Sequence, residues 1–360
     1  MPSGDGLVVR IRPRLAELTA AQLTGIAGAA LSYGNGIIDF TTRANLQLRG
    51  VTEASHRPLI AQLDALGLID PDLHTESGRN VVISPFWAGD EVRSLVESLY
   101  ETLRNRLELP AKFGFAVDMG ETRVLADTSA DIRIERGTQG LILRADGMVG
   151  GQSVTPETAV AAAMRMAEWF VASGGVVAGR GRMAAHVLRE ALPFDSTKIP
   201  GTQAPKSGPG VTPMGALIGF EFGSLRAERL AEIAGLCPKI RITPWRMILL
   251  SGVAISARPG VIIDPDDPRL RVLACTGAPG CPQALHETRN LARRLAPAVP
   301  VGKLLHVSGC GKGCAHPGPT ELTLSATPEG FALLPHGRAG GVGLVVPAQA
   351  ITLETIGKAM

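Results

Sequence analysis

Four cysteines in the last quarter of the chain are the residues whose spacing most clearly predicts chemistry. Cys275 and Cys281 lie in the segment ACTGAPGC, and Cys310 and Cys314 lie in SGCGKGC. Both segments are rich in glycine, which lets the backbone turn tightly and direct its N–H groups inward. An iron–sulfur cluster requires thiolate ligands, and surrounding amide donors stabilise the negative charge on its sulfur atoms. The pattern therefore predicts an iron–sulfur cluster held by these four residues.

A zinc site, a disulfide framework or buried free thiols would account less well for the cysteines. Structural zinc sites usually carry cysteines in Cys-x2-Cys-like pairs, and neither pair here has that spacing. Disulfide frameworks are typical of oxidising compartments, and the segment MPSGDGLVVR does not resemble a signal peptide. Buried cysteines without a cofactor would not cluster, yet only Cys237 lies outside the two pairs. We interpret Cys237 as a small buried hydrophobic residue.

The composition bounds the class of protein. With 360 residues, a mass of 37.6 kDa and 45% hydrophobic residues, the chain can form two or three domains with packed cores. A net charge of +3 and an aromatic content of 4% do not favour a nucleic-acid partner. No apolar run has the length of a membrane span, so we expect no membrane partner and a cytoplasmic location. Most of the basic residues are arginine, which suits bidentate capture of carboxylates.

The chain contains two copies of one pattern. IIDFTTRANLQLRGV (37–51) aligns with KIRITPWRMILLSGV (239–253), and each is preceded by a strand-like run and a helix-like run. The segments that follow also correspond in order, with 78–89 matching 271–281 and 109–118 matching 304–314. We therefore expect an α+β fold made of a duplicated module with pseudo-two-fold symmetry, and a site between the halves.

The duplication predicts five parts along the chain. Two ferredoxin-like half-domains are each followed by a larger α/β domain, and only the second of these carries cysteines. A segment rich in proline, glycine and polar residues predicts an exposed linker between the two copies. The expected boundaries are 1–70, 71–195, 196–210 for the linker, 211–262 and 263–360.

Basic residues gather at the ends of predicted strands in the first half. Alternation in RANLQLR predicts that Arg43, Asn45, Gln47 and Arg49 share one face of a strand. A solvated edge strand would give the same pattern, but cations recur on neighbouring segments, which favours a binding site. The further members of this set are Arg10, Arg12, Arg79 and Lys112. Several cations in one place suit a ligand with many carboxylates.

Few motifs beyond these carry chemistry. His306 and His316 flank the last cysteine pair, and we interpret each as a hydrogen-bond donor near the site rather than a ligand. No GxGxxG sequence follows a predicted strand and opens a helix, which argues against a nucleotide-binding domain. Electrons must then come from an external donor or reductase.

These motifs together resemble the sulfite and nitrite reductase superfamily over nearly the whole chain. The resemblance rests on TTRANLQLRG, GRNVV, LPAKF, ACTGAPGC and GCGKGC, in that order. It implies that Cys275, Cys281, Cys310 and Cys314 hold a [4Fe–4S] cluster. In reductases the last cysteine, which matches Cys314, bridges the cluster to sirohaem. Reductases also tend to carry a second lysine in a KFK segment, where this chain has Gly114.

Within the superfamily, SGDGLVVRIRP and LLHVSGCGKGCAHPGPTELTL are similar to the branch that acts in aerobic cobalamin biosynthesis. That likeness implies a monooxygenase that uses O2 to convert precorrin-3A to precorrin-3B by hydroxylation and γ-lactone formation, with a possible mononuclear non-haem iron for which His306 and His316 are weak candidates. It implies catalytic roles for Arg10, Arg79 and Lys112. The implied substrate-binding residues are Arg10, Arg43, Gln47, Arg49 and Arg79.

Two alternatives remain open. The chain could be a sirohaem-dependent sulfite or nitrite reductase in which the same cluster serves a bound sirohaem. It could also be a non-catalytic protein that binds a tetrapyrrole or transfers electrons. Bound sirohaem distinguishes the first alternative, and a lack of turnover distinguishes the second.

Overall fold

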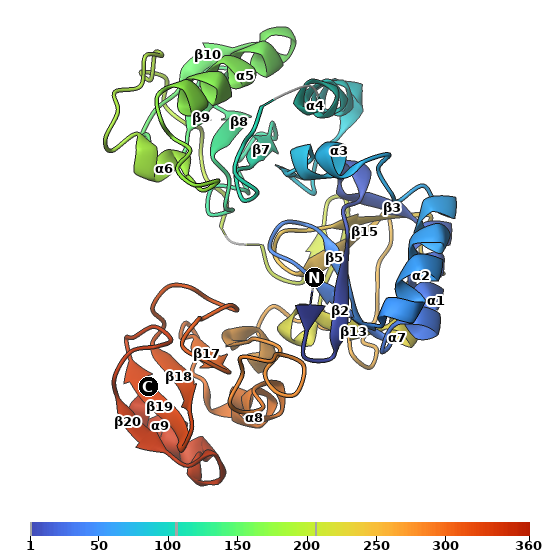
Figure 1. Ribbon diagram of the computed structural model, residues 1–360, viewed down its shortest axis with the longest axis vertical. Helices are drawn as coiled ribbons and strands as arrows, with labels where there is room; N and C mark the ends of the chain where they lie inside the picture. The colour runs from blue at the N-terminus through green and yellow to red at the C-terminus, as the bar shows by residue number, and fades with distance from the viewer. Residues whose placement is uncertain (1, 105–106, 206) are drawn as a thin grey trace.

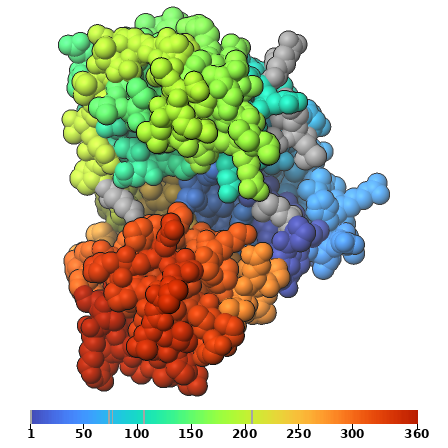
Figure 2. All heavy atoms as spheres, turned by 60° about the vertical axis from the view of Figure 1, so that its left-hand side comes forward, coloured from blue at the N-terminus to red at the C-terminus, as the bar shows by residue number. Residues whose placement is uncertain are grey.

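The structure is a computed structural model that describes residues 2–104, 107–205 and 207–360. The described residues form four five-stranded sheets, two central and two outer. Figure 1 shows an outer lobe at the top, the central sheets with their helices in the middle, and a second outer lobe at the bottom that contains the C-terminus. In Figure 2 the two outer lobes face each other across a band where the central residues are visible.

The two central sheets are related by the sequence duplication and exchange one strand each. The first sheet has the order β1 (Pro2–Ser3), β2 (Gly6–Ile11), β5 (Leu46–Val51), β4 (Ile37–Phe40) and β13 (Ser224–Arg226). The second has the order β11 (Gly210–Thr212), β12 (Gly215–Gly219), β15 (Met247–Ser251), β14 (Lys239–Ile242) and β3 (Glu17–Thr19). Thus β13 of the second copy completes the first sheet, and β3 of the first copy completes the second.

Helices from both copies share one core over these sheets. They are α1 (Ala20–Tyr33), α2 (Glu53–Ala65) and α7 (Ala227–Ala234). Leu23 and Ile26 of α1, Leu230 of α7 and Leu48 of β5 are all buried in the same cluster. Alternation in β5 places Leu46 and Leu48 in this core, so its intervening residues face the opposite side of the sheet.

The two outer lobes have the same sheet topology. The upper lobe contains β6 (Val81–Ile83), β7 (Phe115–Asp118), β8 (Ile132–Arg136), β9 (Leu141–Ala145) and β10 (Gln152–Val154). The lower lobe contains β16 (Val272–Ala274), β17 (Leu305–Ser308), β18 (Leu322–Thr327), β19 (Gly330–Pro335) and β20 (Leu344–Val346). In both sheets the first three strands are parallel and the last two pairings are antiparallel. The expected α+β duplicated fold is confirmed.

The remaining helices belong to the outer lobes and the segments that lead into them. The upper lobe carries α4 (Gly89–Leu103), α5 (Pro156–Ala172) and α6 (Met183–His186), with α3 (Leu73–Gly78) preceding β6, and the lower lobe carries α8 (Arg289–Leu295) and α9 (Leu353–Ala359). The segment expected to be a linker, 196–210, bridges to the upper lobe through Lys198, Pro200 and Gln203, and position 206 lies outside the described residues. Among the described helices, none is long and apolar enough to cross a membrane.

Candidate active site

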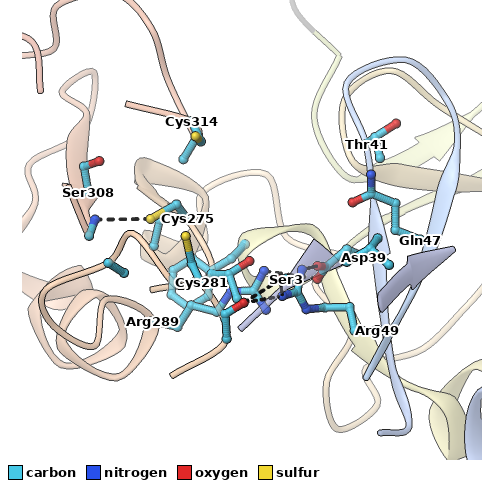
Figure 3. Close-up of a pocket in the computed structure, with 18 of the residues that line it drawn as sticks. Ser3, Asp39, Thr41, Gln47, Arg49, Cys275, Cys281, Arg289, Ser308 and Cys314 are labelled. Carbon is cyan, nitrogen blue, oxygen red and sulfur yellow. Dashed lines mark hydrogen bonds and ion pairs between the residues drawn. The ribbon is translucent and has the colours of Figure 1, made fainter. Parts of the chain in front are cut away.

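A cavity of about 400 Å³ lies where the lower lobe meets the first central sheet (Figure 3). One wall consists of the turns that follow β16 and β17. The other wall includes the face of β4 and β5 that points away from the shared core, with Asp39, Gln47 and Arg49. All four cysteines of the predicted cluster line this cavity: Cys275, Cys281, Cys310 and Cys314.

Parallel strands bring the cysteine turns together. Cys275 directly follows β16 and Cys310 lies two residues after β17, and the two strands pair in parallel with Ala274 opposite Val307. Both turns therefore leave the sheet at the same edge. The Gly309 N–H donates to Cys275 Sγ at 3.2 Å, which is the kind of amide-to-sulfur contact that the glycine-rich sequence predicts.

The donor set fits an iron–sulfur cluster. All four cysteines are free thiols, and burial, followed by the neighbouring Cys275 and Cys310, raises the pKa of Cys314. Bound iron would offset that cost, since iron binds the thiolate form. Within the described residues, no group of three or more His, Cys, Asp or Glu side chains is placed to hold a single metal ion. In a [4Fe–4S] cluster each of the four thiolates binds a different iron.

Arg49 lies at the cavity wall but is fully engaged. It is buried, and its guanidinium forms ion pairs with Asp5 at 2.8 Å and Asp39 at 3.4 Å. Asp39 also pairs with Arg289 of the lower lobe at 3.1 Å. Gln47, in contrast, presents its side chain to the cavity (Figure 3). The expectation that Gln47 and Arg49 share a face of one strand is met by the register of β5.

The same expectation is wrong for Arg43 and Asn45. The strand begins at Leu46, and residues 41–45 form a turn closed by the Thr41 N–H donating to Asn45 O at 2.9 Å. Ala44 has a φ of 53°, which ends the alternation on which the prediction depended. Arg43 instead reaches the upper lobe, where it donates to Lys112 O at 3.1 Å.

The remaining predicted cations lie close to this contact between Arg43 and the upper lobe. Arg10, Arg12 and Arg79 line a second cavity, of about 570 Å³. Arg79 is buried and donates to both carboxylate oxygens of Asp70 and to Arg12 O at 3.1 Å. Lys112 is exposed. Thus none of the predicted cations other than Arg49 lines the cysteine cavity among the described residues.

Sequence reasoning missed three further arginines, of which Arg289 lines the cysteine cavity and pairs with Asp39. Burial lowers the pKa of Arg43, and Arg182 is the neighbouring charge that adds most to this effect. Arg182 precedes α6 and pairs with the buried Asp131 at 2.9 Å, but no strand pattern marked it. Arg246 lines the cysteine cavity and donates to Ala315 O at 3.2 Å. Arg246 aligns with Ala44 when the sequences of the two copies are compared, and both residues have a positive φ, of 60° and 53°. The duplication could therefore have pointed to the position of Arg246.

The two histidines lie side by side behind the last cysteine pair. The rings of His306 and His316 are 6.1 Å apart. His306 is fully buried, and neither of its ring nitrogens has a hydrogen-bond partner among the described residues. Burial, and then His316 and Arg246, lowers the pKa of His306 to about 4. The expected hydrogen-bond donor role of His306 is therefore not realised in this arrangement.

Comparisons with known proteins give the class first. Residues 1–66 match the nitrite/sulfite reductase ferredoxin-like half domain. The structure is similar to that of the NirA protein of Mycobacterium tuberculosis, with a TM-score of 0.66 over 98% of this chain and 79% of that one, at 17% identity. The fold is thus that of nitrite and sulfite reductase-like proteins.

Proteins with similar sequences identify the family within this class. The chain is 32% identical to a precorrin-3B synthase from Sinorhizobium sp, over 95% of this chain and 82% of that protein. It is 23% identical to a ferredoxin–nitrite reductase of Synechococcus elongatus, over 88% and 75% of the two chains. The chain belongs to the precorrin-3B synthase family.

Proposed function

We propose that the protein is an iron–sulfur monooxygenase that converts precorrin-3A to precorrin-3B. The observation that carries this proposal is the cavity in which four cysteine thiols of the lower lobe face a polar sheet surface of the first copy. The relative that is 32% identical to this chain is named a precorrin-3B synthase, which supports precorrin-3B as the product. A tetrapyrrole rich in carboxylates suits the arginines that border the central sheets.

The proposed reaction balances with an external donor. One atom of O2 enters the macrocycle as a hydroxyl at the meso carbon between rings A and D, and the ring A acetate closes the γ-lactone. The other oxygen atom leaves as water after uptake of two electrons and two protons. Cys275, Cys281, Cys310 and Cys314 would hold a [4Fe–4S] cluster, which would relay single electrons from the donor.

The chain's own residues position the macrocycle. Arg10 and Lys112 have no hydrogen bond or ion pair from their side chains within the described part of the chain, and each can capture a carboxylate. Arg43 joins them from the central turn. Gln47 offers a neutral donor within the cysteine cavity. Arg79 is already held by Asp70, so we assign it to orienting the Arg12 backbone beside the substrate rather than to direct capture.

The position of Gly114 favours this reaction over oxyanion reduction. Reductases of the superfamily tend to carry a second lysine here. A β-carbon at Gly114 would lie 2.8 Å from Asn80 Nδ2 and 3.0 Å from Asn80 O, so a side chain here would require Asn80 to shift. The site therefore lacks one of the cations that would stabilise a reduced oxyanion. A sirohaem-dependent reductase remains the alternative.

The first experiment is the optical spectrum of anaerobically purified protein, with iron and acid-labile sulfide analysis. We expect a broad sulfur-to-iron absorption without sharp macrocycle bands, and O2-dependent turnover of precorrin-3A with a chemical reductant. Sharp sirohaem bands beside the cluster absorption would favour the reductase. A cluster with tetrapyrrole affinity but no turnover would favour a binding protein.

Replacing Arg43 by alanine tests the proposed carboxylate site. We expect the dissociation constant for precorrin-3A to rise about tenfold, the loss of one charge-assisted pair, with the iron content unchanged. Arg229→Ala is the matched control, because Arg229 is an exposed arginine on α7 whose ion pair is with the neighbouring Glu232. Equal affinities of the Arg43→Ala variant and the wild type would remove Arg43 from the site.

A further inference from the structure

The turn that carries Cys281 is held by residues from the other end of the chain. Gly280 O accepts hydrogen bonds from Arg49 Nη2 at 2.8 Å and from Ser3 Oγ at 2.7 Å (Figure 3). We propose that Ser3, Asp5 and Arg49, which we call the N-terminal clamp, position the Cys281 turn for cluster binding, and that Arg49 is not a substrate ligand. The proposal rests on the proposed function only in placing a cluster at the four cysteines.

The hydrogen bonds of Arg49 support this assignment. Its Nε donates to Asp5 at 2.9 Å, and its Nη2 donates to Asp5 at 2.8 Å, to Ser3 Oγ at 2.9 Å and to Gly280 O. Its Nη1 faces Asp39 at 3.4 Å. Arg49 is only 6% exposed, so a substrate carboxylate would have to displace protein partners that already satisfy the guanidinium.

Backbone packing brings the clamp close to the turn. A β-carbon on Gly4 would lie 2.3 Å from Pro279 O and 3.1 Å from Cys281 N. Any side chain at this position would therefore push the N-terminal segment away from the turn or distort the turn itself. Gly4 thus offers a way to disturb the clamp without changing a charge.

The central sheet of the second copy lacks the clamp, and the upper lobe that packs against it lacks the cysteines. Strand pairing in the two central sheets makes Met214 the counterpart of Asp5, and the sequence alignment makes Ser251 the counterpart of Arg49. Met214 packs against a buried apolar cluster of the second central sheet, and so does Phe86, which lies in the turn after β6 that corresponds to the cysteine turn after β16. Where the turn has no cysteine, apolar packing replaces the ion pair. The clamp therefore occurs only beside the turn that carries cysteines and is not a general feature of the duplicated fold.

The test compares cluster retention with tetrapyrrole affinity. We expect Arg49→Ala to lose iron and sulfide to a chelator at least five times faster than the wild type, while its dissociation constant for precorrin-3A changes less than twofold. Arg49→Lys should recover part of the retention, because a lysine can reach Gly280 O but cannot bind Asp5 through two parallel bonds. A tenfold loss of tetrapyrrole affinity with normal cluster retention would overturn the proposal.

A second pair of variants keeps the test valid if Arg49→Ala is poorly folded. Gly4→Ala should accelerate cluster loss in the same way, whereas Gly28→Ala in α1, which has open space around the new carbon, should not. In cluster-free protein, Arg49→Ala and Gly4→Ala should raise the alkylation rate of Cys281 relative to Cys314, and equal rates would contradict the clamp. Wild-type protein that binds neither iron nor sulfide would instead contradict the proposed function, and the alkylation comparison would still decide on the clamp.

Discussion

Asp118 organises the loop of the upper lobe that corresponds to a cysteine turn of the lower lobe. It ends β7 at the position that Ser308 occupies at the end of β17, where the cysteine turn begins. One carboxylate oxygen accepts the N–H groups of Val124 and Leu125, each at 2.7 Å, and so organises the following loop. The second oxygen has no hydrogen-bond partner among the described residues. Burial raises the pKa of Asp118 to about 6.

This pKa predicts a pH dependence of stability. Because the pKa rises from about 4 in the unfolded chain to about 6 in the folded protein, the folded state keeps the proton up to a higher pH than the unfolded chain. The free energy of unfolding should therefore fall by about 2–3 kcal/mol as the pH rises from 4 to 7. Neighbouring charges contribute in opposite directions, with Glu135 raising and Arg123 lowering this pKa.

Denaturant unfolding of the wild type and Asp118→Asn across this pH range measures the effect. The difference between the two proteins should move with pH in favour of the variant, while Glu101→Gln, an exposed control, should follow the wild type. A difference that is constant from pH 4 to pH 7 would show that the carboxyl group does not titrate in this window.

At the scale of elements, the first turn of α1 differs between the two copies. Thr19 precedes α1 and its Oγ1 accepts the Gln22 N–H at 3.2 Å, while the Gln22 side chain accepts the Thr19 N–H at 3.0 Å. Arg226 precedes the equivalent helix α7 and makes no such bond from its side chain. Only the first copy therefore has a side-chain cap at this helix.

Removing the cap should destabilise the protein. We expect Thr19→Ala to lower the free energy of unfolding by about 1 kcal/mol, because the Gln22 N–H at the start of α1 loses its acceptor. Arg226→Ala is the matched control and should change it by less than about 0.5 kcal/mol, since its ion pair with Glu228 is exposed. Denaturant midpoints of both variants check the prediction, and equal losses would contradict it.

The sequence was informative about elements and less so about their partners. The cysteine turns, the duplicated topology and the alternation of β5 follow from local spacing and periodicity. The exchange of β3 and β13 does not, because each strand has only three residues and its partner lies in the other copy. The role of Arg49 was equally out of reach, since its partners Ser3, Asp5 and Gly280 are distant in sequence. Periodicity reports which face a residue occupies, but not which group meets it there.

At the scale of the whole molecule, the two copies form one folding unit. The core over the central sheets takes buried residues from both copies, and each central sheet contains a strand from the other. The segment between the copies runs along the upper lobe of the first copy, with which residues 198–204 form a series of backbone hydrogen bonds. The shared core, rather than this connection, therefore holds the two copies together.

Cutting the chain within residues 205–208 tests this conclusion. With a protease site introduced there, we expect the two fragments to elute as one complex in gel filtration and to keep a cooperative unfolding transition. A cut inside α5, which removes part of the upper lobe core, serves as the destabilising control. Separate elution of the fragments under native conditions would mean that each copy is stable by itself.

The exchanged strand β13 has a consequence for biogenesis. While the ribosome is still making the second copy, β4 has no partner on one side, and its edge stays open until residues 224–226 have emerged. The unpaired N–H and C=O groups of an open strand edge in a nascent chain can pair with strands of other chains. The newly made protein therefore passes through a stage in which chaperones have a defined edge to protect, and the cysteines at the end of the chain emerge only after that edge has closed.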